Sequence, residues 1–116
     1  MASSQFNLHS NLTYSTTGLT ASKCTIEAGG YARDGKQVII NIRLRTTDTL
    51  AANTIVELVK GFPPADAGSY AVVALAVSAY TDATAYLGGN GALNFMRAQG
   101  MGANNVINLS ASYIAR

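Results

Sequence analysis

Residues 69–80 read SYAVVALAVSAY, with no charged side chain and with apolar or small residues at both odd and even positions. Successive side chains of a β-strand point to opposite faces of its sheet, so a strand here would present such residues on both faces. The other strand-like runs of the chain alternate apolar with polar residues, as half-buried strands do. The run therefore predicts a strand covered on both sides, with one face in the core of its own chain and the other against further copies of the chain.

The rest of the chain divides into short strand-like runs separated by turn residues. The clearest turn is at Asp34 and Gly35, since Asp-Gly between two such runs is typical of a tight hairpin. Gly29 and Gly30 predict a bulge, and residues 61–64 predict a break because proline cannot donate a sheet hydrogen bond. The expected strands are residues 12–17, 22–33, 38–45, 54–60, 70–80, 81–87, 92–98 and 106–115.

These short runs, with no sustained helical period, predict an all-β fold, an antiparallel β-sandwich of jelly-roll type with about eight strands. A chain of 116 residues suits a single domain that buries about 65% of the surface of the unfolded form. Residues 1–10 are polar and are interpreted as a junction or tag remnant, which leaves residues 11–116 as the domain. The uncharged run leads us to expect an assembly of several copies of the chain.

The composition narrows the classes of partner. Charged residues make up 12% of the chain, against about 25% in an average protein, which suggests that part of the surface is covered by neighbouring subunits. The net charge is only +2 and the cations are scattered, so we expect no nucleic-acid binding. No apolar run approaches the roughly 20 residues that span a bilayer, so we expect no membrane insertion.

The residue types needed for catalysis and metal binding are scarce. Cys24 is the only cysteine and His9 the only histidine, which leaves no intrachain disulfide, no cysteine cluster for zinc and no Ser-His-Asp triad within one chain. The six carboxylates are dispersed, and we expect Cys24 to be a small core residue. We therefore expect no enzyme activity, no cofactor and no metal site.

One predicted hairpin collects aromatic, amide and charged side chains of the kinds that bind sugars. Rings stack on sugar faces, and amides and carboxylates bond to hydroxyl groups; tyrosines also pack in cores and interfaces, so a structural role is an equal alternative for each residue. The candidate glycan-binding residues are Tyr80, Asp82, Tyr86, Asn90, Asn94 and Arg97. Small side chains allow close approach of two copies, and the candidate trimer-interface residues are Ala71, Val73, Ala74, Ala76 and Ala79.

Five segments together carry a family resemblance: GGYAR at residues 29–33, GKQVIINI at 35–42, AANT at 51–54, KGFPP at 60–64 and INLSASYI at 107–114. From about residue 22 to the end, the chain resembles the C-terminal receptor-binding head domain of bacteriophage and prophage tail fibre or baseplate proteins. The resemblance implies a trimer at the tail tip of the virion, made in the bacterial cytoplasm. It also implies non-catalytic host adhesion through a cell-surface polysaccharide or other cell-wall glycan, but it assigns no individual binding residues.

Two further classes remain open. A structural virion module, such as a capsid decoration or a fibre-trimerisation unit, would assemble in the same way and bind no sugar. A carbohydrate-binding module of a secreted enzyme would be monomeric and would carry a more prominent aromatic platform, which the absence of tryptophan argues against.

Overall fold

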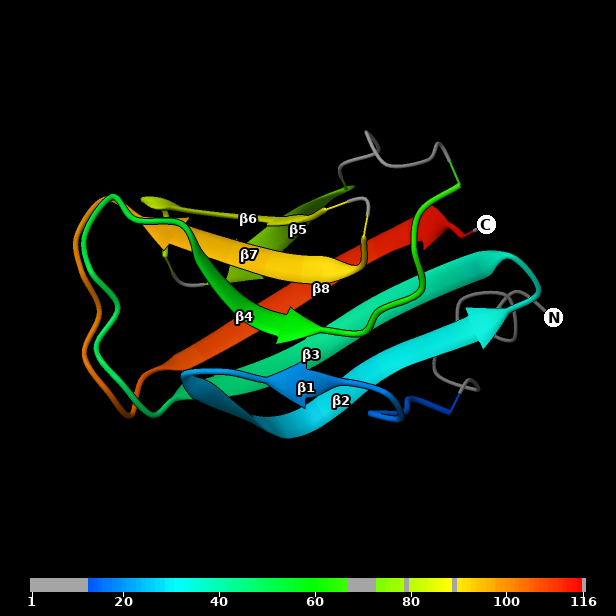
Figure 1. Ribbon diagram of the computed structural model, residues 1–116, viewed down its shortest axis with the longest axis horizontal. Coiled ribbons are helices and arrows are strands. Elements are labelled where there is room, and N and C mark those ends of the chain that lie inside the picture. Colours follow the sequence, from blue (N-terminus) through cyan, green and yellow to red (C-terminus); the bar gives the residue numbers. More distant parts are fainter. Residues whose placement is uncertain (1–12, 67–72, 79, 89, 116) are drawn as a thin grey trace, which may run out of the picture.

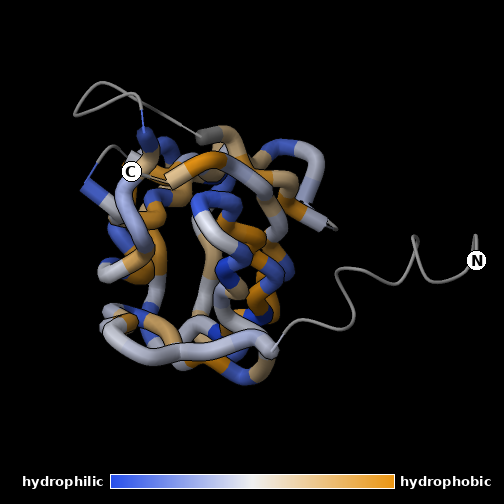
Figure 2. Tube along the Cα trace, turned by 90° about the vertical axis from the view of Figure 1, so that its right-hand side faces the viewer, coloured by the Kyte–Doolittle hydropathy of each residue, from blue (hydrophilic) through white to orange (hydrophobic). Residues whose placement is uncertain are grey.

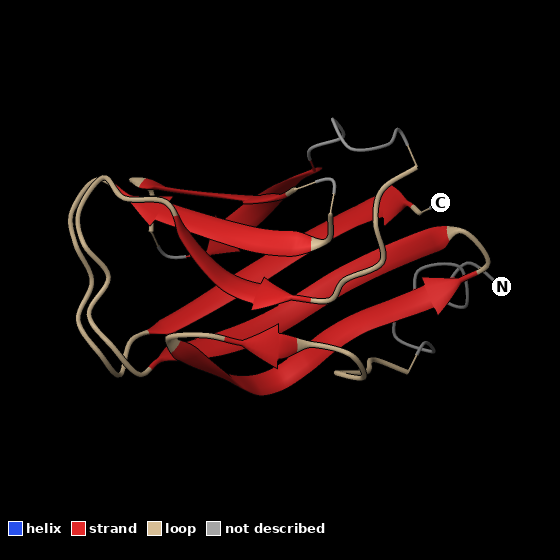
Figure 3. Cartoon of the chain, in the orientation of Figure 1, coloured by secondary structure: helices blue, strands red, loops and turns tan. Residues whose placement is uncertain are grey.

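The computed structural model describes residues 13–66, 73–78, 80–88 and 90–115. These residues form β-strands and no helix (Figures 1 and 3). The strands are β1 (Thr20–Ala21), β2 (Cys24–Asp34), β3 (Gln37–Thr46), β4 (Val56–Lys60), β5 (Val73–Ser78), β6 (Ala83–Leu87), β7 (Ala92–Arg97) and β8 (Val106–Ile114).

All the strands belong to one antiparallel sheet, in the order β1-β4-β7-β6-β5-β8-β3-β2. The sheet curls round until β1 contacts β2, so the molecule is nearly a barrel, and Figure 2 shows the chain wrapped around its own centre. The last two strands lie between earlier ones, with β7 between β4 and β6 and with β8 between β3 and β5. The prediction of an all-β antiparallel fold is confirmed.

The inward face of this sheet is the hydrophobic core. On β3 the residues Val38, Ile40, Ile42 and Leu44 are buried, because the strand alternates apolar with polar residues along its length. Ile39, which departs from that alternation, is also buried although its parity places it on the outward face. The predicted hairpin after β2 is confirmed, with Asp34 opposite Gln37.

A short N-terminal segment joins the two edges of the curled sheet. Ser15 exchanges two backbone hydrogen bonds with Tyr31 of β2, at 2.8 and 3.0 Å, while Thr20–Ala21 pair with β4. The predicted strand at residues 12–17 is wrong, because within its described part only this single bridge forms. Gly30 is required at the seam, since a Cβ there would lie 2.1 Å from the Ser15 carbonyl oxygen.

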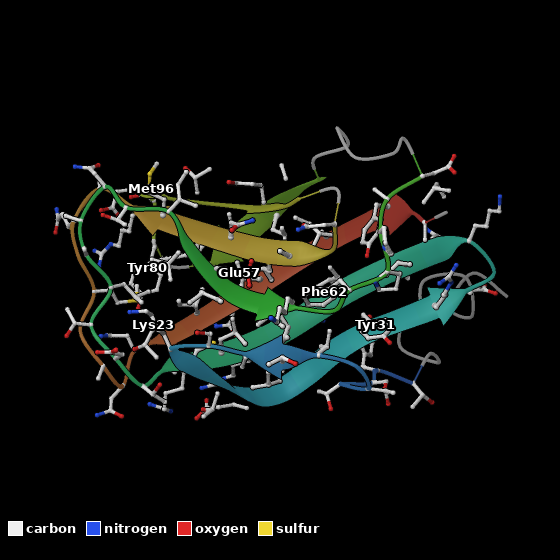
Figure 4. The ribbon with its side chains drawn as sticks, in the orientation of Figure 1. Lys23, Tyr31, Glu57, Phe62, Tyr80 and Met96 are labelled. Carbon is white, nitrogen blue, oxygen red and sulfur yellow. The ribbon has the colours of Figure 1, made fainter. Side chains whose placement is uncertain are left out.

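Aromatic packing reinforces the same seam. Tyr31 and Phe62 are neighbours in Figure 4. Their rings lie edge to face with the centroids 6.0 Å apart, and the Tyr31 hydroxyl donates to the carbonyl oxygen of Thr17 at 2.9 Å. The predicted bulge in β2 lies earlier than expected, between Ile26 and Ala28. The extra residue there is Glu27, whose carboxylate reaches two arginines of β3.

Two crossover loops, residues 47–55 and 98–105, close one end of the barrel. They run side by side at the left of Figure 1 and are joined by backbone hydrogen bonds between Leu50 and Met101, at 2.7 and 2.9 Å. Both of these side chains are buried. Leu50 and Met101 therefore anchor the two loops to the core.

Strand β5 is the centre of the run that predicts a strand covered on both faces. Its first half, Val73 to Leu75, pairs with β6, and its second half, Ala76 to Ser78, pairs with β8, so β5 connects the two halves of the curled sheet. Leu75 is buried, whereas Ala74, Ala76 and Ser78 are exposed. The predicted covering of one face by the chain's own core is confirmed; the other face is open in a single chain.

Candidate functional site

The predicted glycan-binding hairpin is formed by β6 and β7. Tyr86 is paired with Asn94 near the turn, and Ala83 is paired with Arg97 at the opposite end. Asn90 belongs to the turn, where its side-chain oxygen accepts a hydrogen bond from the Ala92 backbone at 3.2 Å. The hairpin therefore separates the six candidate residues into two groups.

The first group, Tyr80, Asp82 and Arg97, lies at the end of the barrel that the crossover loops close. Arg97 Nε donates to both carboxylate oxygens of Asp82, at 2.9 and 3.2 Å, and its guanidinium carbon lies 4.8 Å from the centroid of the Tyr80 ring. The hydrogen bond from Arg97 holds the pKa of Asp82 below its usual range. One face of the ring, the carboxylate and the guanidinium are thus already engaged with one another, which indicates a structural role.

The second group lies on the outward face of the sheet. Tyr86 is half-buried there between Ala74 of β5 and Asn94 of β7, and Asn94 is in turn opposite Glu57 of β4. The Asn94 side-chain NH₂ donates to the Ala92 carbonyl oxygen at 3.2 Å. Glu57, labelled at β4 in Figure 4, is exposed. It makes no ion pair with a described residue. We call Ala74, Tyr86, Asn94 and Glu57 the Tyr86 row.

Glu57 could not be placed in this row from the sequence. Its neighbour Asn94 is far along the chain, and only the pairing of β4 with β7 brings the two together. The row combines an aromatic ring, an amide and a carboxylate, which are the groups that bind a sugar.

The outward face of β5 and β8 is uncharged and made of short side chains. Ala76 is opposite Ser110, and Ser78 is opposite Asn108. We call the exposed residues Ala74, Ala76, Ser78 and Ser110 the β5–β8 face. A hollow of about 210 Å³ lies over part of it, and Asn41 and Asn108 also border this hollow. Of the predicted interface residues, Ala74 and Ala76 are on this face, while Ala71, Ala79 and the side chain of Val73 lie outside what the structure describes.

A second hollow, of about 270 Å³, continues from the first toward β2. It is bordered by Tyr14, Ala28, Gly29, Asn41, Arg43 and Asn108, and we call it the Asn41–Asn108 hollow after the two amides shared with the first. The side chains of Asn41 and Asn108 are exposed and make no hydrogen bond within the described part of the chain. The alternation of β3 and β8 predicted both as solvated polar residues; their convergence depends on the pairing of these two strands.

Charge at the edge of this hollow is concentrated in one carboxylate and two guanidinium groups. Arg45 makes a bidentate contact with Glu27, whereas Arg43 lies at 3.3 Å from the same carboxylate through its Nε. The hydrogen bond from Arg45, followed by the charges of both arginines, lowers the pKa of Glu27, so this carboxylate is ionised at neutral pH. Arg43 is 51% exposed.

The remaining nucleophilic and acid–base groups serve the core. Cys24 Sγ donates to the Leu58 carbonyl oxygen at 3.4 Å and burial raises the pKa of the thiol, so the prediction of a core cysteine is confirmed. Burial also raises the pKa of Tyr113 to about 12, and its hydroxyl donates to the Pro63 carbonyl oxygen at 2.7 Å. In the described ranges no three His, Cys, Asp or Glu side chains are grouped so as to hold a metal ion. His9 lies outside these ranges.

Comparison with protein-family models, with curated proteins and with solved structures finds no match to this chain. Within the residues described here, no helix could span a membrane.

Proposed function

We propose that this chain is a non-catalytic receptor-binding domain that assembles as a homotrimer and binds a bacterial surface glycan, in the manner of a phage tail head of jelly-roll type. The observation that carries the proposal is that an exposed, uncharged face of small side chains directly adjoins a row with the groups that bind sugars. Ala74 belongs to both, because it lies on β5 opposite Tyr86. The site of action would be the tail tip of the virion.

The β5–β8 face supports self-association. Charged side chains resist desolvation, and long ones hold neighbouring backbones apart, so a face of alanine and serine is suited to close packing of one sheet against another. An isolated exposed apolar residue needs no partner, but this face continues across two strands without a charge. A further copy of the chain is the partner that the proposal assigns to it.

The Tyr86 row supports glycan binding. The ring offers a flat apolar surface, while the Asn94 side-chain oxygen and the Glu57 carboxylate offer acceptors for sugar hydroxyl groups. A shallow site of this kind binds at about millimolar affinity, or ~4 kcal/mol. Three sites in a trimer, and several trimers in a particle, would raise the effective affinity by about 10² to 10⁴ without any new contact.

The binding site is tested by changing Tyr86 to alanine. Binding of the fluorescently labelled trimer to a bacterial glycan array or to host cells should fall at least tenfold, because the stacking surface is lost. The matched control is Tyr80→Phe, which keeps the ring beneath Arg97 and should bind as the wild type does. Equal binding by Tyr86→Ala and the wild type would place the glycan elsewhere.

The assembly is tested by changing Ala76 to arginine. Three long charged side chains brought together on the β5–β8 face should dissociate the trimer completely into folded monomers, as measured by light scattering and circular dichroism. Lys60→Arg, on the opposite half of the sheet, is the control that should remain trimeric. A wild-type chain that is monomeric at micromolar concentration would contradict the proposal.

A structural virion module is the second candidate, and the same uncharged face supports it. It predicts a trimer that depends on Ala76, together with no glycan binding by the wild type on any array. The two experiments therefore separate assembly with a ligand from assembly alone.

A further inference from the structure

The Asn41–Asn108 hollow holds polar groups that have no partner in the fold. Its two amides make no hydrogen bond within the described residues, and its border is free of large side chains at Ala28 and Gly29. A large residue at position 28 would fill the space. The hollow therefore combines open volume with amide groups that make no hydrogen bond to a described residue. In the Arg97 cluster at the end of the barrel, by contrast, the polar groups bind one another.

Arg43 brings an unneutralised charge to this hollow. Its guanidinium pairs with Glu27, to which Nε lies at 3.3 Å, and makes no hydrogen bond or ion pair with another described residue. Glu27 is also shared with Arg45, whose guanidinium donates to both carboxylate oxygens and to the Asn104 carbonyl oxygen. Two guanidinium groups therefore share one carboxylate, and the more exposed of them, Arg43, has no second partner among the described residues.

The chemistry of a matching ligand follows from these groups. The parallel N–H donors of a guanidinium fit a carboxylate or a phosphate, and each such charge-assisted bond is stronger than a neutral one. Asparagine amides both donate to and accept from hydroxyl groups, and Tyr14 is an aromatic residue at the border. A ligand that carries hydroxyl groups and one anionic group would satisfy all of them.

We infer that the Asn41–Asn108 hollow is a second binding site, for a hydroxylated anion of the sugar-acid or polyol-phosphate type. The anionic group lies on Arg43 and the hydroxyl groups on Asn41 and Asn108. The inference rests on the proposed glycan-binding function for the source of such a ligand, a bacterial surface polymer, but not on the Tyr86 row. The Tyr86 row crosses β4, β7, β6 and β5, whereas the hollow is bordered by β8, β3 and β2, so the two sites occupy different strands.

The test is an NMR titration of the ¹⁵N-labelled full chain at constant ionic strength. Glucuronate and glycerol 1-phosphate are the anionic probes, glucose and glycerol their neutral counterparts, and acetate and inorganic phosphate the anions without a sugar or polyol. The backbone amides of Gly29, Asn41 and Asn108 should shift with at least one anionic probe at millimolar concentration. Shifts with glucuronate alone indicate an acidic sugar, and shifts with glycerol 1-phosphate alone indicate a phosphorylated polyol.

Arg43→Gln should weaken binding of the effective probe about tenfold and remove its advantage over the neutral counterpart. Lys60→Gln, which removes the same charge from the opposite half of the sheet, should have no effect. Ala28→Phe should abolish the shifts by filling the hollow while leaving the circular dichroism spectrum unchanged. The inference is overturned if neither anionic probe shifts these amides, if Arg43→Gln binds as the wild type does, or if acetate and phosphate act equally well.

The proposed adhesion function and the proposed second binding site can be contradicted independently of each other. A wild-type chain that binds no cell or array glycan but binds a probe in the hollow would overturn the proposed function alone. A chain that adheres through Tyr86 and shows no effect of Arg43→Gln would overturn the hollow alone.

Discussion

Arg97 and Arg43 are both paired with a carboxylate, yet their surroundings differ in every other respect. Arg97 contacts both oxygens of Asp82, lies over the Tyr80 ring and has a side chain only 23% exposed. Arg43 shares Glu27 with Arg45, lies over no ring of a described residue and is 51% exposed. A guanidinium that is fully engaged holds the fold together, whereas one with unused donors is available to a ligand, so a cluster of suitable residue types is not by itself a site.

The largest expected contrast is between the inward and outward faces of the strand that carries Asn108. Leu109→Ala should lower the free energy of unfolding by about 3 kcal/mol, because Leu109 is buried and its removal leaves a cavity. Ser110→Ala, one residue further along on the outward face, should change it by less than about 0.5 kcal/mol. Urea unfolding at one fixed protein concentration measures both. A large loss for Ser110→Ala would mean that the outward face contributes to stability as the inward face does.

The two arginines provide the next contrast. Arg97→Gln should lower the melting temperature more than Arg43→Gln does, since it removes the bidentate ion pair and the contact with Tyr80 together. Differential scanning fluorimetry of both variants beside Lys60→Gln controls for the change in net charge. If Arg43→Gln proved the more destabilising, the division into a structural and an available arginine would be wrong.

The smallest expected effect is the pH dependence of the two ion pairs. The pKa values of Asp82 and Glu27 are both lowered in the fold, so their ionised forms stabilise it at pH values above the ordinary carboxyl pKa of about 4. That contribution is lost as pH falls through the lowered folded-state values. The stability difference between the wild type and Asp82→Asn, or Glu27→Gln, should therefore shrink below about pH 4. A difference that stays constant from pH 7 to pH 2 would contradict this assignment.

The sequence pattern predicts much of the fold because it concerns neighbours in the chain. The hairpins after β2 and β6, the alternation of β3 and β8 and the break at residues 61–64 are confirmed. The bulge was placed at the glycines but occurs at Glu27, where one extra residue brings a carboxylate to two arginines. The predicted strand at residues 12–17 is wrong, because the described part of this segment forms only the single bridge between Ser15 and Tyr31.

The candidate sites were less predictable, for a physical reason that the hairpin illustrates. Tyr80 and Tyr86 are close in sequence and alike in chemistry, but one lies beneath Arg97 and the other on the outward face beside Asn94. Asn41 and Asn108 were both visible as polar positions of alternating strands, yet nothing in either run indicates that β3 pairs with β8.

The sequence by itself determined the all-β class, the antiparallel hairpins and the inward residues, because turn chemistry and a period of two act over a few residues. Only the tertiary structure decided that the sheet closes on itself, that β5 is shared between its halves and leaves one face open, and which polar groups remain unsatisfied. These features depend on long-range strand pairing, where the free energy comes from contacts between residues far apart in the chain.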